Sequence, residues 1–250
     1  MTLEAQLLHA GPLVRVLDVR CAAPASGPGA EEHNPAADVL LPRRGVFAVH
    51  RGRDTLVAGA GVALVLGAAE SYRVSHPAGG GDRCTVLRFA PAVHEEAFGD
   101  LGTRMHGAPL RPPPAGEEDA LLLFADVAAA PLTPGPAAAR RAGAVRALLA
   151  ADPGRAWSLA GVAAEVHCSP FHLARQFRAA TGTTIGRHLL RLRLSLALDR
   201  LEQGEDDLAR LAADLGFAGH SHLTARFREA FGRPPSQMRK TLTARRRRRA

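Results

Sequence analysis

Two segments of the chain, about 50 residues apart, carry side chains with the chemistry needed to read DNA bases. Each segment reads as a helix whose outward side offers arginine, histidine or hydroxyl groups. Such a helix fits the major groove, which is roughly 12 Å wide, and arginine can pair bidentately with guanine there. The outward residues are Phe171, His172, Ala174, Arg175, Arg178 and Ala179 in the first segment, and Gly219, His220, Ser221, Thr224, Ala225 and Arg228 in the second.

Two pairs of residues at matched positions in these segments also have plainer explanations. Arg178 and Arg228 could equally line a solvated helix face. His172 and His222 recur at matched positions beside a core leucine, and for them a packing or backbone role is favoured over base reading.

The residues that could support catalysis or metal binding form no familiar pattern. A metal-dependent barrel needs a His-x-His pair with a further histidine and a carboxylate. No GxSxG, P-loop or dinucleotide-binding motif is present either. We therefore expect no catalysis, no cofactor and no stoichiometric transition metal. The histidines of the first half are single and scattered, and the three cysteines are far apart: His33, His50, His76, His94, His106, Cys21, Cys84 and Cys168.

Charge divides the chain into two unlike halves. The 250 residues allow one or two domains, and at 46% hydrophobic content they can bury a core. Residues 1–136 hold 11 Lys+Arg against 15 Asp+Glu, whereas residues 137–250 hold 21 against 9, of which five belong to the Arg245–Arg249 tail. A basic half joined to a mildly acidic one suggests that the basic half binds a polyanion.

No membrane span or secretory signal is visible in the sequence. The longest apolar stretch, Leu56–Ala69, has 14 residues, and about 20 are needed to cross a bilayer. The widely separated cysteines suit a reducing compartment. We therefore expect a cytoplasmic protein that is not a membrane partner.

The first half reads as many short strands. Apolar runs recur about every ten residues with turn residues between them, as in a sandwich or small barrel. Residues 51–54 and 77–82 are expected to form hairpin loops. The seven runs are Leu13–Cys21, Val39–Leu41, Val46–Val49, Thr55–Val57, Val62–Leu66, Tyr72–Ser75 and Cys84–Phe89.

A helix and a proline-rich linker are expected before the second half. Pro112–Pro114 is a stiff break, and residues 117–130 read as a helix that offers Leu121, Leu122, Phe124 and Ala125 for packing. Pro131–Pro136 is the best linker candidate, because proline stops both helices and sheets.

The second half contains an internal repeat. Leu159–Val166 aligns with Leu208–Leu215 at four identical positions of eight, and His172–Gly182 aligns with His222–Gly232 at six of 11. Each copy reads as a helix, a tight turn and a second helix. Ser158, Ser169 and either Asp206 or Asp207 are expected N-caps, and Gly182 and Gly232 are expected C-terminal stops. The expected inward residues are Leu159, Val162, Ala163, Val166, Leu173, Phe177, Ala180, Leu223, Phe227 and Ala230.

A long helix, Arg187–Gln203, is expected between the two copies. Its 17 residues would span about 26 Å at 1.5 Å per residue. Major-groove faces lie about 34 Å apart along one side of a duplex, so one chain could read neighbouring turns.

The segment from Trp157 to Arg239 resembles the DNA-binding domain of the AraC/XylS family of bacterial transcriptional regulators. The resemblance is carried by SLAGVAAEVHCSPFHLARQFRAATG, by RHLLRLRLSLALDRL and by DLARLAADLGFAGHSHLTARFREAFGRPPSQMRK. The stretches LLPRRGVFAVH, LVLGAAESYRVSHP and GGDRCTVLRF are similar to those of the family's cupin-type sensor domain.

This resemblance implies roles for particular residues. The first recognition helix falls on Pro170–Ala180, with Phe171, Ala174 and Arg175 at the bases. The second falls on His220–Ala230, with His220, Ser221, Thr224 and Ala225 at the groove. The family commonly has arginine at the position of Ala225, and Gly219 is a poorer cap than the usual serine, so the first unit should carry more of the specificity. The implied effector pocket in the barrel would involve Arg43, Phe47, Tyr72 and His76.

These observations predict a multidomain protein of mixed α and β structure. We expect a cupin-like barrel with trailing helices over residues 1–110, a dimerising helix and linker over 111–136, an all-α domain with two helix-turn-helix units over 137–242 and a basic tail over 243–250. The predicted function is sequence-specific binding of double-stranded DNA in transcription regulation under a small-molecule effector, as a homodimer and, in an activator, with RNA polymerase. Two alternatives remain: a cupin-type enzyme with an autoregulatory DNA-binding domain, and a non-specific DNA-coating protein.

Overall fold

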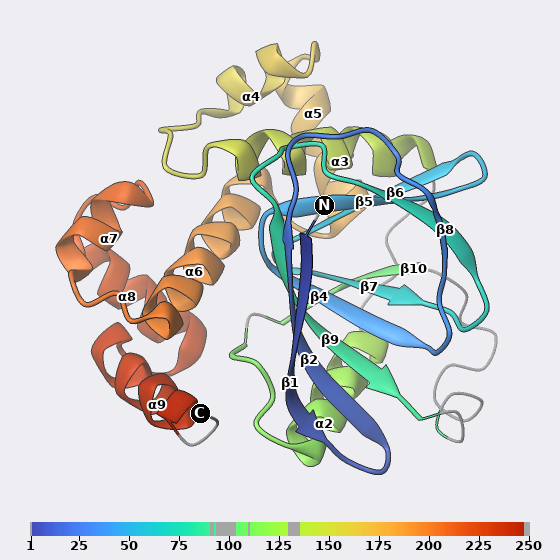
Figure 1. Cartoon of the computed structure of the whole chain (residues 1–250). Coiled ribbons are helices and arrows are strands. Elements are labelled where there is room, and N and C mark those ends of the chain that lie inside the picture. The colour runs from blue at the N-terminus through green and yellow to red at the C-terminus, as the bar shows by residue number, and fades with distance from the viewer. Residues whose placement is uncertain (1, 91–92, 94–103, 110, 130–135, 248–250) are drawn as a thin grey trace.

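Figure 1 shows a computed structural model of the chain, in which two β-sheets face a group of helices. The structure describes residues 2–90, 93, 104–109, 111–129 and 136–247. Both sheets are antiparallel. The six-stranded sheet has the order β1 (Thr2–Ala10), β2 (Val14–Ala22), β9 (Asp82–Phe89), β4 (Asp38–Arg44), β7 (Val62–Leu66) and β10 (Arg104–Gly107). The four-stranded sheet has the order β3 (Glu31–His33), β8 (Ser71–Ser75), β5 (Val46–Arg51) and β6 (Asp54–Gly59).

All seven strands predicted from apolar runs are present. Strands β1, β3 and β10 were not predicted. β3 has only exposed side chains, and the exposed Leu3 and Leu7 of β1 lie among polar residues, so neither strand shows a clear apolar run. The hairpin at residues 51–54 is confirmed, because Arg51 pairs with Asp54 between β5 and β6. The predicted hairpin at residues 77–82 is wrong: β8 and β9 belong to different sheets, so this loop crosses between the sheets.

Strand β2 contributes side chains to a core on each face of the six-stranded sheet, because its side chains alternate between the faces. Val14 and Val16 of β2 belong to a core under helix α2 (Glu117–Ala129). Leu17 and Val19 point the other way, into a core that the two sheets share. This period of two is the expected consequence of strand geometry.

Helix α2 is confirmed, but its buried face differs from the predicted one. Ala120, Leu123 and Val127 are buried against the sheet, whereas Leu122 and Ala125 are exposed. The buried residues follow an i, i+3, i+7 pattern. Of the other residues expected to pack, Leu121 and Phe124 are half-buried, and the ring of Phe124 lies 4.9 Å from that of Phe89.

Seven helices follow in the described part of the chain, and one of them joins two cores. They are α3 (Pro136–Ala151), α4 (Leu159–Glu165), α5 (Pro170–Thr181), α6 (Ile185–Gln203), α7 (Leu208–Asp214), α8 (His220–Phe231) and α9 (Pro235–Arg247). The start of α6 packs with α3, α4 and α5, and its later turns pack with α7, α8 and α9. Figure 1 shows these two groups at opposite ends of α6. None of the described helices is both long and apolar enough to span a bilayer.

Helix α3 attaches the helical half of the chain, which consists of α3 to α9, to strand β6. A Cβ atom on Gly143 would lie 2.6 Å from Val57 Cγ2, so this close approach requires glycine. Arg146 is buried beside it and donates to the carbonyl oxygen of Val57 over 3.2 Å, while burial lowers its pKa to about 10. The predicted linker, residues 131–135, lies outside the described residues, and Pro136 already begins α3.

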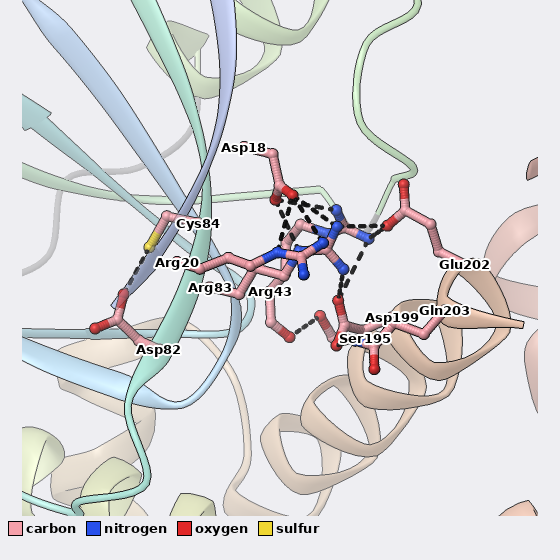
Figure 2. A network of polar contacts seen from close by, with 10 residues as sticks. All are labelled: Asp18, Arg20, Arg43, Asp82, Arg83, Cys84, Ser195, Asp199, Glu202 and Gln203. Atoms are coloured by element: carbon pink, nitrogen blue, oxygen red, sulfur yellow. Dashed lines mark hydrogen bonds and ion pairs between the residues drawn. The ribbon is translucent and has the colours of Figure 1, made fainter. Parts of the chain in front are cut away.

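A buried cluster of charges makes the second attachment, between the six-stranded sheet and α6 (Figure 2). Arg83 of β9 donates to both oxygens of Asp18, over 2.7 and 2.8 Å, and also to Asp199 of α6. Arg43 of β4 pairs with Glu202, and its carbonyl oxygen accepts a 2.7 Å hydrogen bond from Ser195. Side chains of this ion-pair cluster are at most 17% exposed, so the charges are paired away from water.

The partners determine the protonation of this cluster. Burial alone would raise the pKa of Asp18, but the hydrogen bonds and charge of Arg83, with help from Arg43 and Arg20, hold it below its usual value. Burial likewise opposes the charge of Arg83, yet Asp18, Asp199 and Glu202 raise its pKa. Asp18 and Arg83 are therefore charged near neutral pH.

Replacing Arg83 with methionine should lower the free energy of unfolding by about 3–5 kcal/mol, because Asp18 and Asp199 would stay buried without their main partner. Chemical denaturation at neutral pH measures this change. The control is Arg73→Met, which breaks an exposed pair with Glu31 and should cost no more than about 1 kcal/mol. Equal effects of the two substitutions would contradict a structural role for the buried cluster.

Candidate nucleic-acid interface

The repeated sequence forms two matching helix pairs, α4 with α5 and α7 with α8. Ser158 accepts a hydrogen bond from the amide of Gly161 over 3.0 Å, and Ser169 accepts one from the amide of His172 over 3.4 Å. Asp207, not Asp206, caps α7. Helices α5 and α8 end at Gly182 and Gly232, both left-handed, as predicted.

The turn inside each pair needs a left-handed residue at the same place. In the first pair this residue is His167, with φ of 49°, and in the second it is Gly216, with φ of 69°. Glycine adopts this conformation without the steric cost that other residues carry. A Cβ on Gly216 would also lie 2.3 Å from the carbonyl oxygen of Gly154, so the second turn has no room for a side chain.

The inward residues of the second helix of each pair fill its core. Leu173, Phe177, Ala180, Leu223 and Phe227 are at most 2% exposed. The prediction is wrong for Ala230, which is exposed, because α9 and the later turns of α6 cover only part of this end of α8. In the first helices, Val162, Ala163, Leu211 and Ala212 are buried, whereas Leu159 is 42% exposed.

The structure places the predicted base-reading residues on one outer stripe of each second helix. Arg175 and Arg178 are exposed on α5, and among the described residues neither forms an ion pair. Phe171 is 79% exposed, an unusual position for a phenylalanine. The remaining members are half-buried or exposed: His172, Ala174, Ala179, His220, Ser221, Thr224, Ala225 and Arg228.

A groove runs beside the first stripe. Its volume is about 520 Å³, and its lining is mostly apolar, with Trp157 and Leu189 at its sides and Phe171, Ala174, Arg175 and Arg178 from α5. Arg155 lies over the Trp157 ring, 4.1 Å from its centre. The stripe thus combines cationic and apolar surface.

Two differences from the first pair bear on how the second pair could contact DNA. Ala225 stands where the first stripe has Arg175, and the neighbouring Arg226 pairs with Glu229 over 2.9 Å and lines a groove with Arg187 of α6. Arg226 therefore does not replace the missing arginine. Gly219 gives α8 no side-chain cap.

His222 serves the backbone, as the plainer explanation had it. The amide of Ala218 donates to His222 Nδ1 over 3.3 Å, and the ring meets Phe217 edge-on at 5.6 Å. His172 is half-buried. His188, which was not singled out from the sequence, is 5% exposed on α6 and meets Phe177 edge-on at 5.7 Å, beneath α5.

The four residues proposed for an effector pocket do not share one site. Arg43 belongs to the ion-pair cluster at α6. Phe47 and Tyr72 lie in the core between the sheets, and burial raises the pKa of Tyr72 to about 12. His76 pairs with Asp82, and its neighbourhood brings together Cys21, His76 and Asp82 as possible metal ligands.

The comparisons with known proteins agree with this geometry. Residues 162–241 match a family model described as a helix-turn-helix domain. The chain is 35% identical over 74 residues to the regulatory protein SoxS of Salmonella typhimurium, covering 30% of this chain and 69% of SoxS. It is 40% identical over 67 residues to the HTH-type transcriptional activator RhaS of Pectobacterium carotovorum, covering 27% of this chain and 24% of RhaS. The chain belongs to the AraC/XylS family of transcriptional regulators.

Other matches extend over different parts of the chain. The DNA-binding domain of AdpA, in complex with a target DNA, has a TM-score of 0.41 and 25% identity, covering 42% of this chain and 96% of that one. ToxT of Vibrio cholerae covers 93% of this chain at a TM-score of 0.40 and 12% identity. The chain spans less than a third of the length of RhaS and of the other curated relatives matched first.

Mutating Gly216 to alanine should lower the free energy of unfolding by about 1–3 kcal/mol or more, because the left-handed backbone and the contact with Gly154 both oppose a side chain. The matched variant is His167→Gly, which relieves the same backbone conformation in the first turn and should not lower stability. Urea denaturation of both variants measures the difference. A similar loss in both would show that the left-handed residue is not the determinant.

Stability should depend on the protonation of His188. Burial first, and then the charges of Arg146 and Arg191, lower the pKa of His188 to about 3. Between about pH 3 and 6.5, the unfolded chain therefore binds a proton at His188 that the folded chain does not bind. The free energy of unfolding should therefore fall as the pH decreases from about 6.5 towards 3, by up to about 1.4 kcal/mol per pH unit.

Replacing His188 with leucine should remove this part of the slope. Denaturation curves at about pH 7 and about pH 5 test the expectation, with the exposed His33→Gln as control. An unchanged slope in His188→Leu would assign the pH dependence to other groups.

Proposed function

We propose that this protein is a sequence-specific DNA-binding transcription regulator in which both helix pairs are helix-turn-helix units and α5 and α8 are recognition helices. The observation that carries the proposal is the outer stripe of each second helix, which presents exposed cationic or hydroxyl side chains: Arg175 and Arg178 on α5, and Ser221 and Arg228 on α8. Family membership supports it, since SoxS and RhaS are named as regulators.

The length of α6 supports the use of both units on one duplex. Its 19 residues span about 28 Å, close to the separation of about 34 Å between successive major grooves on one side of DNA. The bases would be contacted chiefly from Phe171, Ala174 and Arg175, and then from His220, Ser221 and Thr224. Arg178, Arg228 and the Arg245–Arg249 tail would contact phosphates, which give affinity without specificity.

The half of the chain that forms the two sheets, the β-half, would serve as the regulatory part of the same molecule. We assign residues 1–110 to a cupin-like barrel that senses a small molecule, residues 111–136 to a dimerising segment and linker, and residues 137–242 to the DNA-binding domain. The two attachments of the sheets, to α3 and to α6, supply a route by which a change in the barrel reaches DNA. Homodimer formation and contact with RNA polymerase belong to this proposal. So do a cytoplasmic location and the lack of enzymatic activity.

Replacing Arg175 with alanine should separate base reading from phosphate binding. Loss of a hydrogen bond to a base edge affects only the cognate site. Arg175→Ala should therefore weaken binding to the operator by about 1–3 kcal/mol, and weaken binding to random DNA much less. The operator is first selected from random duplexes with the full-length protein. Fluorescence titration of operator and scrambled duplex at several salt concentrations then gives both affinities.

The matched control is Arg73→Ala, which removes an equal charge from the exposed surface of β8. Deleting residues 245–249 should weaken both duplexes equally and reduce the salt dependence by up to about 0.9 logarithmic unit of slope for each phosphate that the tail neutralises. A parallel loss on both duplexes in Arg175→Ala would contradict base reading. Selection that yields no preferred sequence would favour a non-specific DNA-coating protein.

A further inference from the structure

Three potential metal ligands meet at one end of the space between the two sheets. The ligand atoms of Cys21, His76 and Asp82 all lie within 4.8 Å of one another. Cys21 and Asp82 are directly opposite partners on β2 and β9, so their side chains share one face of the six-stranded sheet. His76 follows β8, in the other sheet. Residues separated by up to 61 positions in sequence thus converge.

A fourth donor, Cys84, lies beside these three. It is two residues beyond Asp82 on β9 and therefore on the same face of the strand. Its Sγ donates to Asp82 Oδ1 over 3.4 Å, and Figure 2 shows this pair on the side of β9 away from the ion-pair cluster. Cys84 is opposite Val19, so it is diagonal to Cys21, at a Cα separation of about 7–8 Å. A disulfide needs Cα atoms about 4.4–6.8 Å apart, and both thiols are free.

Three of these four donors are buried. His76 is 2% exposed, Cys84 3% and Cys21 7%. His76 Nε2 lies 2.8 Å from Asp82 Oδ2, but His76 Nδ1 is buried with no hydrogen-bond partner among the described residues. Buried polar atoms in folded proteins nearly always have a partner, so the unpartnered nitrogen of a buried imidazole that adjoins thiols and a carboxylate points to a ligand.

We propose that Cys21, His76, Asp82 and Cys84 bind one divalent transition-metal ion of the zinc type. Thiolate, imidazole and carboxylate are the ligands that zinc takes in tetrahedral sites, and the two thiols disfavour magnesium and calcium. Zinc–sulfur bonds of about 2.3 Å and zinc–nitrogen bonds of about 2.0 Å place tetrahedral ligands about 3.3–3.8 Å apart. The ligand atoms of Cys21, His76 and Asp82, within 4.8 Å of one another, would have to move closer together to reach that spacing, and Cys84 Sγ would complete the set from its place beside Asp82.

An open groove gives the ion a path to the site and connects the site to α6. Its volume is about 330 Å³, and it is lined by Cys21 and Asp82 together with Arg83, Asp199 and Gln203. Arg83 follows Asp82 directly and is an ion-pair partner of α6. An ion at Asp82 is therefore one residue away from the attachment of the helical half. This proposal departs from the expectation of no metal, which rested on the spacing of the histidines and cysteines along the sequence.

The test uses full-length protein without a histidine tag, stripped with a chelator under reducing conditions and titrated with cobalt(II) and then zinc. One equivalent of cobalt should produce the intense visible bands of a four-coordinate ion and a near-ultraviolet charge-transfer band from thiolate. One equivalent of zinc should displace it. Absence of binding at micromolar metal, or cobalt bands without thiolate charge transfer, would overturn the proposal.

Variants assign the ligands. Cys21→Ser and His76→Gln should each weaken zinc binding more than about 100-fold, since removing a group that merely supports a ligand already costs about 10–100-fold. Cys84→Ser should reduce the charge-transfer intensity. Cys168→Ser and His33→Gln are the controls, because these residues lie outside the cluster, and both should bind as the unmodified protein does.

Circular dichroism establishes that each variant is folded before titration. If a cysteine variant fails to fold, His76→Gln and the cobalt spectrum of the unmodified protein still decide the outcome. Unchanged zinc affinity in folded His76→Gln, or an equal loss in His33→Gln, would place any bound ion elsewhere and contradict this site.

Discussion

The ion-pair cluster between the six-stranded sheet and α6 is the constraint on which the placement of the helical half depends. Arg43 and Arg83 come from the sheet, and Asp199 and Glu202 come from α6, so these residues of the two sides neutralise one another across the interface. Removing a charge from water costs several kcal/mol unless a partner compensates. Helix α6 therefore cannot leave the sheet without exposing or orphaning several charges at once.

This constraint matters because α6 contributes side chains to the cores of both helix pairs. Ile185, Leu189 and Leu192 complete the core of the first pair, whereas Leu198 and Leu201 complete that of the second. The spacing and relative rotation of α5 and α8 therefore depend on one continuous helix. The first pair has an additional attachment, because α3 contributes to its core and also packs on β6. Each pair thus has its own connection to the β-half, through α3 for the first and through the later turns of α6 for the second.

The sequence predicted best the features whose interactions are local. The caps at Ser158 and Ser169 and the stops at Gly182 and Gly232 all follow from neighbours within a few residues. Strand pairing was not predictable, because the register that sets Cys21 opposite Asp82 joins distant segments. For the same reason the ion-pair cluster was missed, and Arg43 was assigned to a pocket although it pairs with Glu202, 159 residues away. Local patterns predict which residues lie on the outer stripes, but only the tertiary structure shows which contacts fix the helices that carry them.

The differences between the two pairs give them unequal roles under the proposed function. In the first pair Ser169 already satisfies an amide at the start of α5, and Arg175 is exposed at the centre of the stripe. In the second, Gly219 leaves the first turn of α8 without a side-chain cap, and Ala225 has no hydrogen-bond donor for a base edge. Uncapped amides at a helix N-terminus favour a phosphate oxygen, since the helix dipole adds to their donor capacity. Under the proposed function, the first pair would therefore carry more of the base recognition and the second more of the contact with phosphates, with α6 setting their separation.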